Sequence, residues 1–244
     1  MRLPVKPGLG DTVAMIQVMT PNKPPSIDPR QVPVVQVDGH LPAVAASALA
    51  PQALRARFAS PPVWQPELVA ERKFLDRPPT HAAVLIPIVM RDAPTVLLTE
   101  RPSHMSTHAG QIAFPGGKVD DTDANAVAAA QREAFEEVGL VPELVEVLGQ
   151  LPIYTTGSAF LVTPVVALVQ PGFVLQPNAQ EVSDVFEVPL QFLMDPVNHR
   201  HHQLIWQGVQ RHWLSMPYQD GAQERFIWGA TAGMLRNFYR FLMA

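Results

Sequence analysis

The stretch AFPGGKVDDTDANAVAAAQREAFEEVGL, residues Ala113–Leu140, decides the fold of the middle of this chain. Its second half, from about Asp123 to Val138, is rich in alanine and free of proline, which predicts a helix. Gly139 follows directly and can end that helix in a left-handed conformation. Three neighbouring side chains can cap its first turn: Asp121, Thr122 and Asp123. This helix is the starting point for both the fold and the chemistry.

Three glutamates crowd the last turn of the predicted helix, where like charges repel by roughly 0.2–0.5 kcal/mol per pair. On a helical wheel one side holds Val127, Ala134 and Val138 with Phe135 beside them, and the other holds Glu133, Glu136 and Glu137. A solvated acidic face would explain such a run, but the helix dipole disfavours acids at this end. A hard divalent cation would stabilise them, and the preceding Pro-Gly-Gly allows close backbone approach. We therefore predict a metal site here.

The remaining predicted elements are mostly strands, with a few helices. Apolar runs predict strands over 81–90, 94–101, 111–114, 145–154 and 160–169. A short helix is expected over 188–194, a hairpin over 201–218 and a closing amphipathic helix over 227–243. Strands and helices do not alternate regularly, so the pattern favours an α+β fold with a mixed sheet over a doubly wound fold.

The N-terminal third differs in composition from the rest of the chain. Fourteen of the 26 prolines lie in the first 80 residues, and proline fixes φ and removes a backbone donor. We therefore expect residues 1–40 to be a flexible Pro-rich leader, residues 41–79 a helical appendage, and residues 80–244 the main domain.

Composition excludes several classes of function. A net charge of -4 offers no basic surface for nucleic acid or for a membrane. No apolar run is long enough to span a bilayer. There are no cysteines, which excludes disulfides, thiolate catalysis and cysteine-ligated zinc. We therefore expect a cytoplasmic protein that acts on a small molecule.

The glycines and the acidic helix together resemble the Nudix box, G-x5-E-x7-R-E-U-x-E-E-x-G-U, where U is apolar. Gly117 and the run from Arg132 to Leu140 match it, with Asp123 at the position of the first glutamate and one extra residue before Arg132. The flanking VLLTERPSHMSTHAGQIAFPGG is similar to the coenzyme A pyrophosphatase branch of that family. Downstream, VTPVVALV, EVSDVFEVPL and FIWGATAGML also look like that branch, although Pro102 and Ser106 depart from its pattern.

The resemblance implies an α/β/α sandwich and hydrolysis of coenzyme A, or of a derivative, at its pyrophosphate with Mg²⁺ or Mn²⁺. It implies these metal ligands: Glu133, Glu136, Glu137 and the carbonyl of Gly116. Arg132 would orient the acids, and either Glu133 or Glu181 would be the general base. The implied substrate contacts are Arg101, His108 and Gln111.

Other interpretations of the sequence stay open. A Nudix enzyme could act instead on ADP-ribose, a dinucleotide or a nucleoside triphosphate, and a non-catalytic Nudix module could regulate a partner. A homodimer is a further expectation, because many relatives pair and the closing helix has an apolar face. The run NHRHHQ holds His199, His201 and His202, for which we favour an exposed turn over a zinc site.

Overall fold

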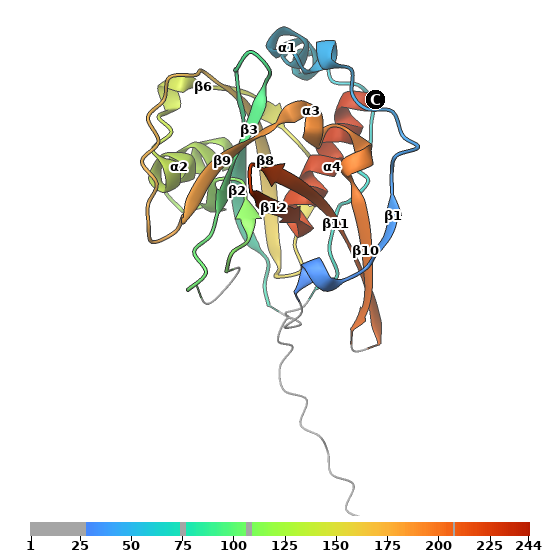
Figure 1. Cartoon of the computed structure of the whole chain (residues 1–244). Coiled ribbons are helices and arrows are strands. Elements are labelled where there is room, and N and C mark those ends of the chain that lie inside the picture. Colours follow the sequence, from blue (N-terminus) through green and yellow to red (C-terminus); the bar gives the residue numbers. More distant parts are fainter. Residues whose placement is uncertain (1–27, 74–76, 106–108, 207) are drawn as a thin grey trace, which may run out of the picture.

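Two β-sheets and four α-helices form the fold in the computed structural model, which describes residues 28–73, 77–105, 109–206 and 208–244 (Figure 1). The larger sheet is mixed and the smaller one is antiparallel. Within these ranges no helix is long and apolar enough to cross a membrane. The prediction of an α+β protein with a mixed sheet is confirmed.

The central sheet has eight strands in the order β4-β3-β2-β8-β6, with β5 on β2, β7 on β8 and β9 on β3. Its strands are β2 (Thr80–Val89), β3 (Thr95–Glu100), β4 (Ile112–Ala113), β5 (Gly116–Lys118), β6 (Val145–Gln150), β7 (Tyr154–Thr155), β8 (Phe160–Val169) and β9 (Asp184–Pro189). The two longest strands, β2 and β8, are parallel and the other pairs are antiparallel. Both are nearly continuous apolar runs, as expected for central strands covered on both faces.

The second sheet has four antiparallel strands in the order β1-β10-β11-β12. They are β1 (Val34–Val37), β10 (Arg200–Trp206), β11 (Val209–Asp220) and β12 (Gln223–Trp228). The hairpin predicted over 201–218 is therefore confirmed as β10 and β11. This sheet also contains a first strand from the N-terminal segment, which the sequence pattern did not predict.

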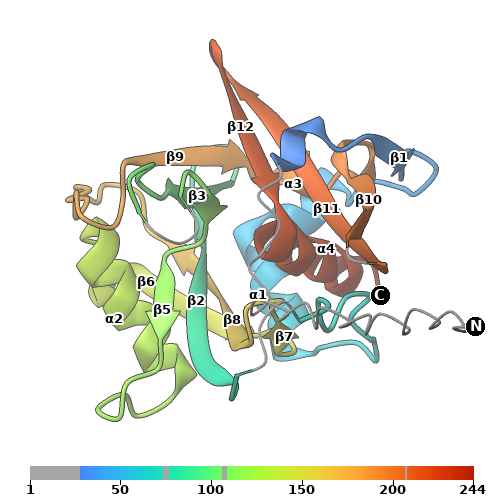
Figure 2. The same cartoon turned by 90° about the horizontal axis from the view of Figure 1, so that it is seen from below.

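Different elements cover the two faces of the central sheet (Figure 2). Helix α2 (Ala126–Val138) lies on one face, and α4 (Gly229–Met243) with β10–β12 lies on the other. Strand side chains alternate accordingly: Leu97 packs in the core beside α2, whereas Leu98 packs in the core that contains α4. Loops at one end of the sheet can thus reach α2 from one face and β12 from the other.

The closing helix α4 is buried over most of its length. Leu235, Phe238 and Tyr239 are at most 1% exposed, and they contribute to the larger of the two cores. The apolar face that suggested a homodimer therefore packs within the chain. The short helix predicted over 188–194 is also present, as α3 (Leu190–Leu193).

The N-terminal third is more closely joined to the rest than we expected. Residues 1–27 of the expected leader lie outside the described ranges, and the part that is described contains β1, which pairs with β10 near the other end of the chain. In the predicted appendage, α1 (Pro51–Ala59) is helical, and the described residues between α1 and β2 form no further helix or strand. The rings of Phe58 and Trp64 lie 4.7 Å and 5.3 Å from that of Phe241 on α4. These long-range contacts have no local signal in the sequence.

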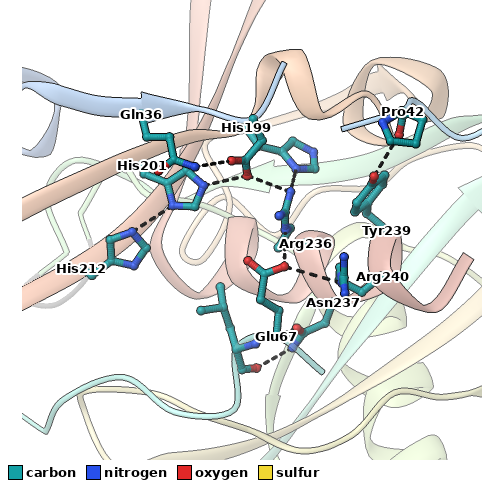
Figure 3. A network of polar contacts seen from close by, with 12 residues as sticks. Gln36, Pro42, Glu67, His199, His201, His212, Arg236, Asn237, Tyr239 and Arg240 are labelled. Carbon is teal, nitrogen blue, oxygen red and sulfur yellow. Dashed lines mark hydrogen bonds and ion pairs between the residues drawn. The ribbon is translucent and has the colours of Figure 1, made fainter. Parts of the chain in front are cut away.

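The expectation of an exposed histidine turn is wrong. His199 is 0% exposed and His202 is 2% exposed, and His201 lies in β10 (Figure 3). Nε2 of His201 lies 2.7 Å from the carboxylate of Asp38, and Arg236 donates to Nδ1 of His199 at 3.0 Å. Asp38 and Arg236 come from distant segments, so the local run did not show that these polar rings have buried partners. No group of three or more metal-ligating side chains converges within the described ranges.

Candidate active site on helix α2

Both ends of helix α2 are capped. Asn125 is the N-cap, and its side-chain oxygen accepts from the N–H groups of Val127 at 2.9 Å and Ala128 at 3.0 Å. The predicted caps at residues 121–123 are therefore wrong by a few positions. Gly139 ends the helix in the left-handed conformation with φ of 74°, as predicted.

Asp123 binds Arg132 instead of capping the helix. Its two carboxylate oxygens accept from Nε and Nη2 of Arg132 at 3.0 Å and 2.9 Å. Hydrogen bonds from Arg132 and from the backbone of Asp120 lower the pKa of Asp123 to about 2. Asp123, which stands where the Nudix box has a glutamate, thus forms a bidentate ion pair with Arg132 of the helix.

Arg132 is also the counter-ion of two of the glutamates. Its Nη1 lies 3.1 Å from Glu133 and 2.9 Å from Glu136. The repulsion within the acidic turn is thus partly offset by one guanidinium that faces Asp123 as well. A metal ion, which the sequence alone suggests, is therefore not the only source of this balance, because Arg132 contributes to it.

Glu137 lies in a different environment from the other two acids. It is only 5% exposed, and its carboxylate accepts from the N–H of Gly116 at 3.1 Å. Burial raises the pKa of Glu137 to about 7, and the neighbouring Glu133 adds to the rise. Phe135, which we placed beside the apolar side, is 52% exposed. The helix is therefore rotated so that Glu137 faces the sheet and Phe135 faces solvent.

The glycines before the helix let the chain pass between α2 and β2. A Cβ atom on Gly116 would lie 2.5 Å from the carbonyl oxygen of Ala83 on β2. A Cβ atom on Gly117 would overlap the carboxylate of Glu133. Only glycine fits this spacing, and it brings backbone N–H and C=O groups next to the two acids.

Two residues far away in the sequence join this cluster. Burial is the main cause of the raised pKa of both Glu133 and Glu137, and the charge of Glu181 adds to it in each case. The positive charge of Arg101 acts on Glu137 in the opposite direction. Arg101 therefore lies within electrostatic reach of Glu137, and Glu181 lies within reach of both Glu133 and Glu137.

Arg101 has an unsatisfied polar atom. Its Nε is buried and has no hydrogen-bond partner in the part of the chain that the structure describes. A buried donor without a partner costs about 1–3 kcal/mol, so an arginine in this state is suited to bind an anion. Of the other predicted substrate contacts, Gln111 accepts from the N–H of Arg101 through its carbonyl oxygen at 3.0 Å. His108 lies outside the described residues, as does Ser106.

The loop with Glu181 is joined to the end of α2 by backbone hydrogen bonds. Asn178 donates to the carbonyl oxygen of Glu137, and Glu181 donates to that of Asn178, both at 2.9 Å. The family resemblance indicates Glu181, but no local sequence pattern indicates these backbone anchors. Nor does any local pattern indicate the ion pairs that Arg225 forms with Glu100 and Asp184 at the strand ends nearby. Isolated charged residues so far apart carry no sequence signal of contact.

The chain matches known proteins over the region that contains this cluster. The family model described as NUDIX domain matches residues 79–207, just over half of the chain. A relative from Enterobacter sp. (strain 638), named uncharacterized Nudix hydrolase NudL, is 48% identical over 163 residues, which cover 64% of this chain and 80% of the relative. The protein of the same name from Escherichia coli (strain K12) is 48% identical over 160 residues, with the same coverage.

Solved structures are less similar. A C. elegans Ap4A hydrolase in a binary complex is 19% identical with a TM-score of 0.40, and the match covers 45% of this chain and 80% of that one. This likeness is too weak to support an argument. The assignment rests on the family match and on the close relatives: the chain belongs to the NUDIX domain family, the Nudix pyrophosphohydrolases.

Proposed function

We propose that this Nudix enzyme hydrolyses the pyrophosphate bond of coenzyme A or of a coenzyme A derivative. The products would be 3',5'-ADP and 4'-phosphopantetheine or its acyl form. The substrate class is supported by the stretch from Val96 to Gly117, which is similar to the coenzyme A pyrophosphatase branch. One observation at Arg101 supports a diphosphate substrate. The buried Nε of Arg101 lacks a hydrogen-bond partner within the described ranges, and Arg101 lies near Glu137.

Arg101 would bind the diphosphate oxygens, because a guanidinium fork matches the geometry of a phosphate. Gln111 adjoins it in the structure, and with His108 it would complete the substrate contacts. In the reaction the oxygen of a water bonds to one phosphorus and the bridging P–O bond breaks. The bridging oxygen leaves with the other phosphate, and the proton of the water passes to a carboxylate.

The donors of the acidic turn are of the type that a hard divalent cation binds, although no three of these carboxylates converge on one point within the described ranges. Glu133, Glu136, Glu137 and the carbonyl of Gly116 are all oxygen ligands, as Mg²⁺ and Mn²⁺ prefer. The raised pKa of Glu137 shows a buried carboxylate whose negative charge is poorly compensated, and a cation would compensate it. When bound, such an ion neutralises the diphosphate oxygens and lowers the pKa of a coordinated water.

Two carboxylates are candidates for the general base. Arg132 donates to Glu133, which orients that carboxylate and opposes the rise in its pKa that burial causes. Glu181 is half-buried, and its charge acts on both Glu133 and Glu137. Arg132 would therefore orient the acids, and either Glu133 or Glu181 would accept the proton.

A second substrate class is favoured by one observation. Pro102 stands where the coenzyme A branch has a small Ser or Ala, and it is buried directly after Arg101. A rigid ring at this position changes the shape of the loop beside the proposed phosphate contact. A different nucleoside diphosphate derivative, such as ADP-ribose or a dinucleotide, or a nucleoside triphosphate, is therefore the alternative.

A substrate panel tests the proposal. Coenzyme A, ADP-ribose, NADH and a nucleoside triphosphate are each incubated with the full chain and Mg²⁺ or Mn²⁺, and the products are identified by mass. We expect 3',5'-ADP and 4'-phosphopantetheine from coenzyme A, and no turnover in EDTA. Hydrolysis of another compound with coenzyme A left intact would contradict the proposed substrate.

A further inference from the structure

Arg225 on β12 forms ion pairs with three carboxylates at the boundary between the two sheets. Its Nη1 lies 3.0 Å from Glu100, its Nη2 lies 2.6 Å from Asp184 and its Nε lies 3.0 Å from Asp220. The side chain is only 7% exposed, and the guanidinium stacks 4.1 Å from the ring centre of Phe186. All three edges of the guanidinium thus have a charged partner, which fixes its position.

Two of these partners belong to the strand ends that carry the proposed site. Glu100 and Asp184 are paired in the last register position of the β3–β9 ladder. Arg101 follows Glu100 directly, and Glu181 precedes Asp184 by three residues. The N–H and hydroxyl of Ser183 both donate to the carbonyl oxygen of Glu100, at 2.8 Å and 2.9 Å. The strand end and the loop are therefore joined into one hydrogen-bonded unit.

Arg225 reaches this unit from the face opposite to α2. Side chains alternate along β3, so Glu100 shares the face of Leu98, which packs in the core with α4. Arg101 falls on the other face, where its charge acts on Glu137 of α2. Arg225 therefore acts on the site through the backbone of β3 and β9 and does not touch the reacting atoms.

We propose that Arg225 is a positioning residue for the hydrolytic site, holding Arg101 and Glu181 at their working separation. This inference rests on the proposed function, in which Arg101 is a substrate contact and Glu181 is one of the two candidate bases. Arg225 lies outside residues 79–207, so a segment beyond the family match would complete the site. Precise placement matters, since a shift of about 1 Å can cost on the order of 100-fold in rate.

A matched pair of variants separates this role from general stability. Asp184→Ala removes the contact from Arg225 to β9, whereas Asp220→Ala removes a contact within the β11–β12 hairpin itself. The two side chains are similarly exposed, at 47% and 40%. Each variant leaves Arg225 with two carboxylate partners, so both should fold, which thermal unfolding of each variant checks.

We expect Asp184→Ala to lower kcat/KM by roughly tenfold through displacement of the loop, and Asp220→Ala to change it by less than about twofold. In a Glu181→Gln background the effect of Asp184→Ala should largely disappear, because both changes act on one group. Equal losses in the two alanine variants, or full additivity with Glu181→Gln, would overturn the inference.

Hydrogen exchange gives a readout that needs no substrate. We expect faster exchange of the amides of residues 181–183 in Asp184→Ala than in Asp220→Ala, because only the first releases the loop. Unchanged exchange in both variants would overturn the positioning role. If no compound in the panel is hydrolysed, the proposed function fails, while this measurement still decides whether Arg225 holds the loop.

Discussion

Glu137 differs from its acidic neighbours because it points towards the sheet. It is 5% exposed, and burial raises its pKa to about 7. Glu136 lies on the solvent side with its side chain 52% exposed, where Arg132 reaches it. One helical turn thus presents two carboxylates in different electrostatic environments, and the buried one gains most from a cation.

The roles of two acids can be tested by removing their charge. We expect Glu133→Gln and Glu137→Gln each to lower turnover by more than about 100-fold, since even indirect partners of a metal are worth roughly 10–100-fold. The folded state should persist, because glutamine keeps the shape of glutamate and removes a charge that is costly to bury. Rates and thermal unfolding are measured beside the control Glu143→Gln, an exposed acid after the helix. Unchanged rates in the two site variants would refute their assignment.

At the scale of elements, α2 depends on its own ends as well as on its packing. Asn125 satisfies two N–H groups in the first turn, and Gly139 donates to carbonyl groups of the last turn. Between them Ala129, Ala130 and Ala134 are fully buried, so the helix lies close to the sheet. The position of the acidic turn against β5 follows from this close packing.

Removing the cap should weaken the helix by a measurable amount. We expect Asn125→Ala to lower the free energy of unfolding by about 1 kcal/mol, because two backbone donors lose their acceptor. Urea unfolding measures the change, and Asp121→Ala is the control, since Asp121 is exposed and does not cap the helix. An equal loss in the control would show that the cap lies where the sequence pattern first suggested.

At the scale of the whole molecule, buried polar contacts join segments from both ends of the chain (Figure 3). Arg236 of α4 lies 3.0 Å from Asp38 and 2.9 Å from Glu67, and it donates to His199. Asp38 follows β1, Glu67 follows α1 and His199 precedes β10. One guanidinium therefore ties the N-terminal third to the closing helix.

This network predicts a dependence of stability on pH. His199 donates from Nε2 to the carbonyl oxygen of Leu193 and accepts at Nδ1 from Arg236, so it is neutral in the folded state. Burial is the main cause that lowers its pKa to about 4. Between about pH 6.5 and pH 4, His199 therefore binds a proton in the unfolded chain but not in the folded chain. Stability falls as the pH drops through this window, by roughly 3 kcal/mol from this group.

The contribution of His199 can be isolated by a difference measurement. Glu137 has a raised pKa and opposes this trend in part of the same window, so the free energy of unfolding is compared between the wild-type chain and His199→Asn from pH 4 to pH 7. We expect the variant to lose the fall in stability that His199 causes. The control is His104→Asn, an exposed turn residue, and identical slopes in all three proteins would contradict the assignment.

Local patterns were enough to predict several elements. The apolar runs of β2 and β8 and the periodicity of α2 and α4 predicted these elements closely. The same patterns failed for Asn125, whose capping role depends on where the first turn begins, and for Phe135 and Glu137, whose exposure depends on the rotation of α2 against the sheet. A helical wheel gives relative directions but not which direction meets the core.

By itself, the sequence determined the family, the acidic turn with its preceding glycines, and the mixed sheet, because these depend on residue types at short, fixed spacings. Only the tertiary structure decided that Glu137 is buried, that Arg101 and Glu181 lie near it, and that Arg225 pairs with Glu100 and Asp184 at the neighbouring strand ends. Contacts between residues 41 to 125 positions apart arise from strand pairing and layer packing. The energies of these contacts depend on how deeply the side chains are buried, and burial cannot be predicted from a short stretch of sequence.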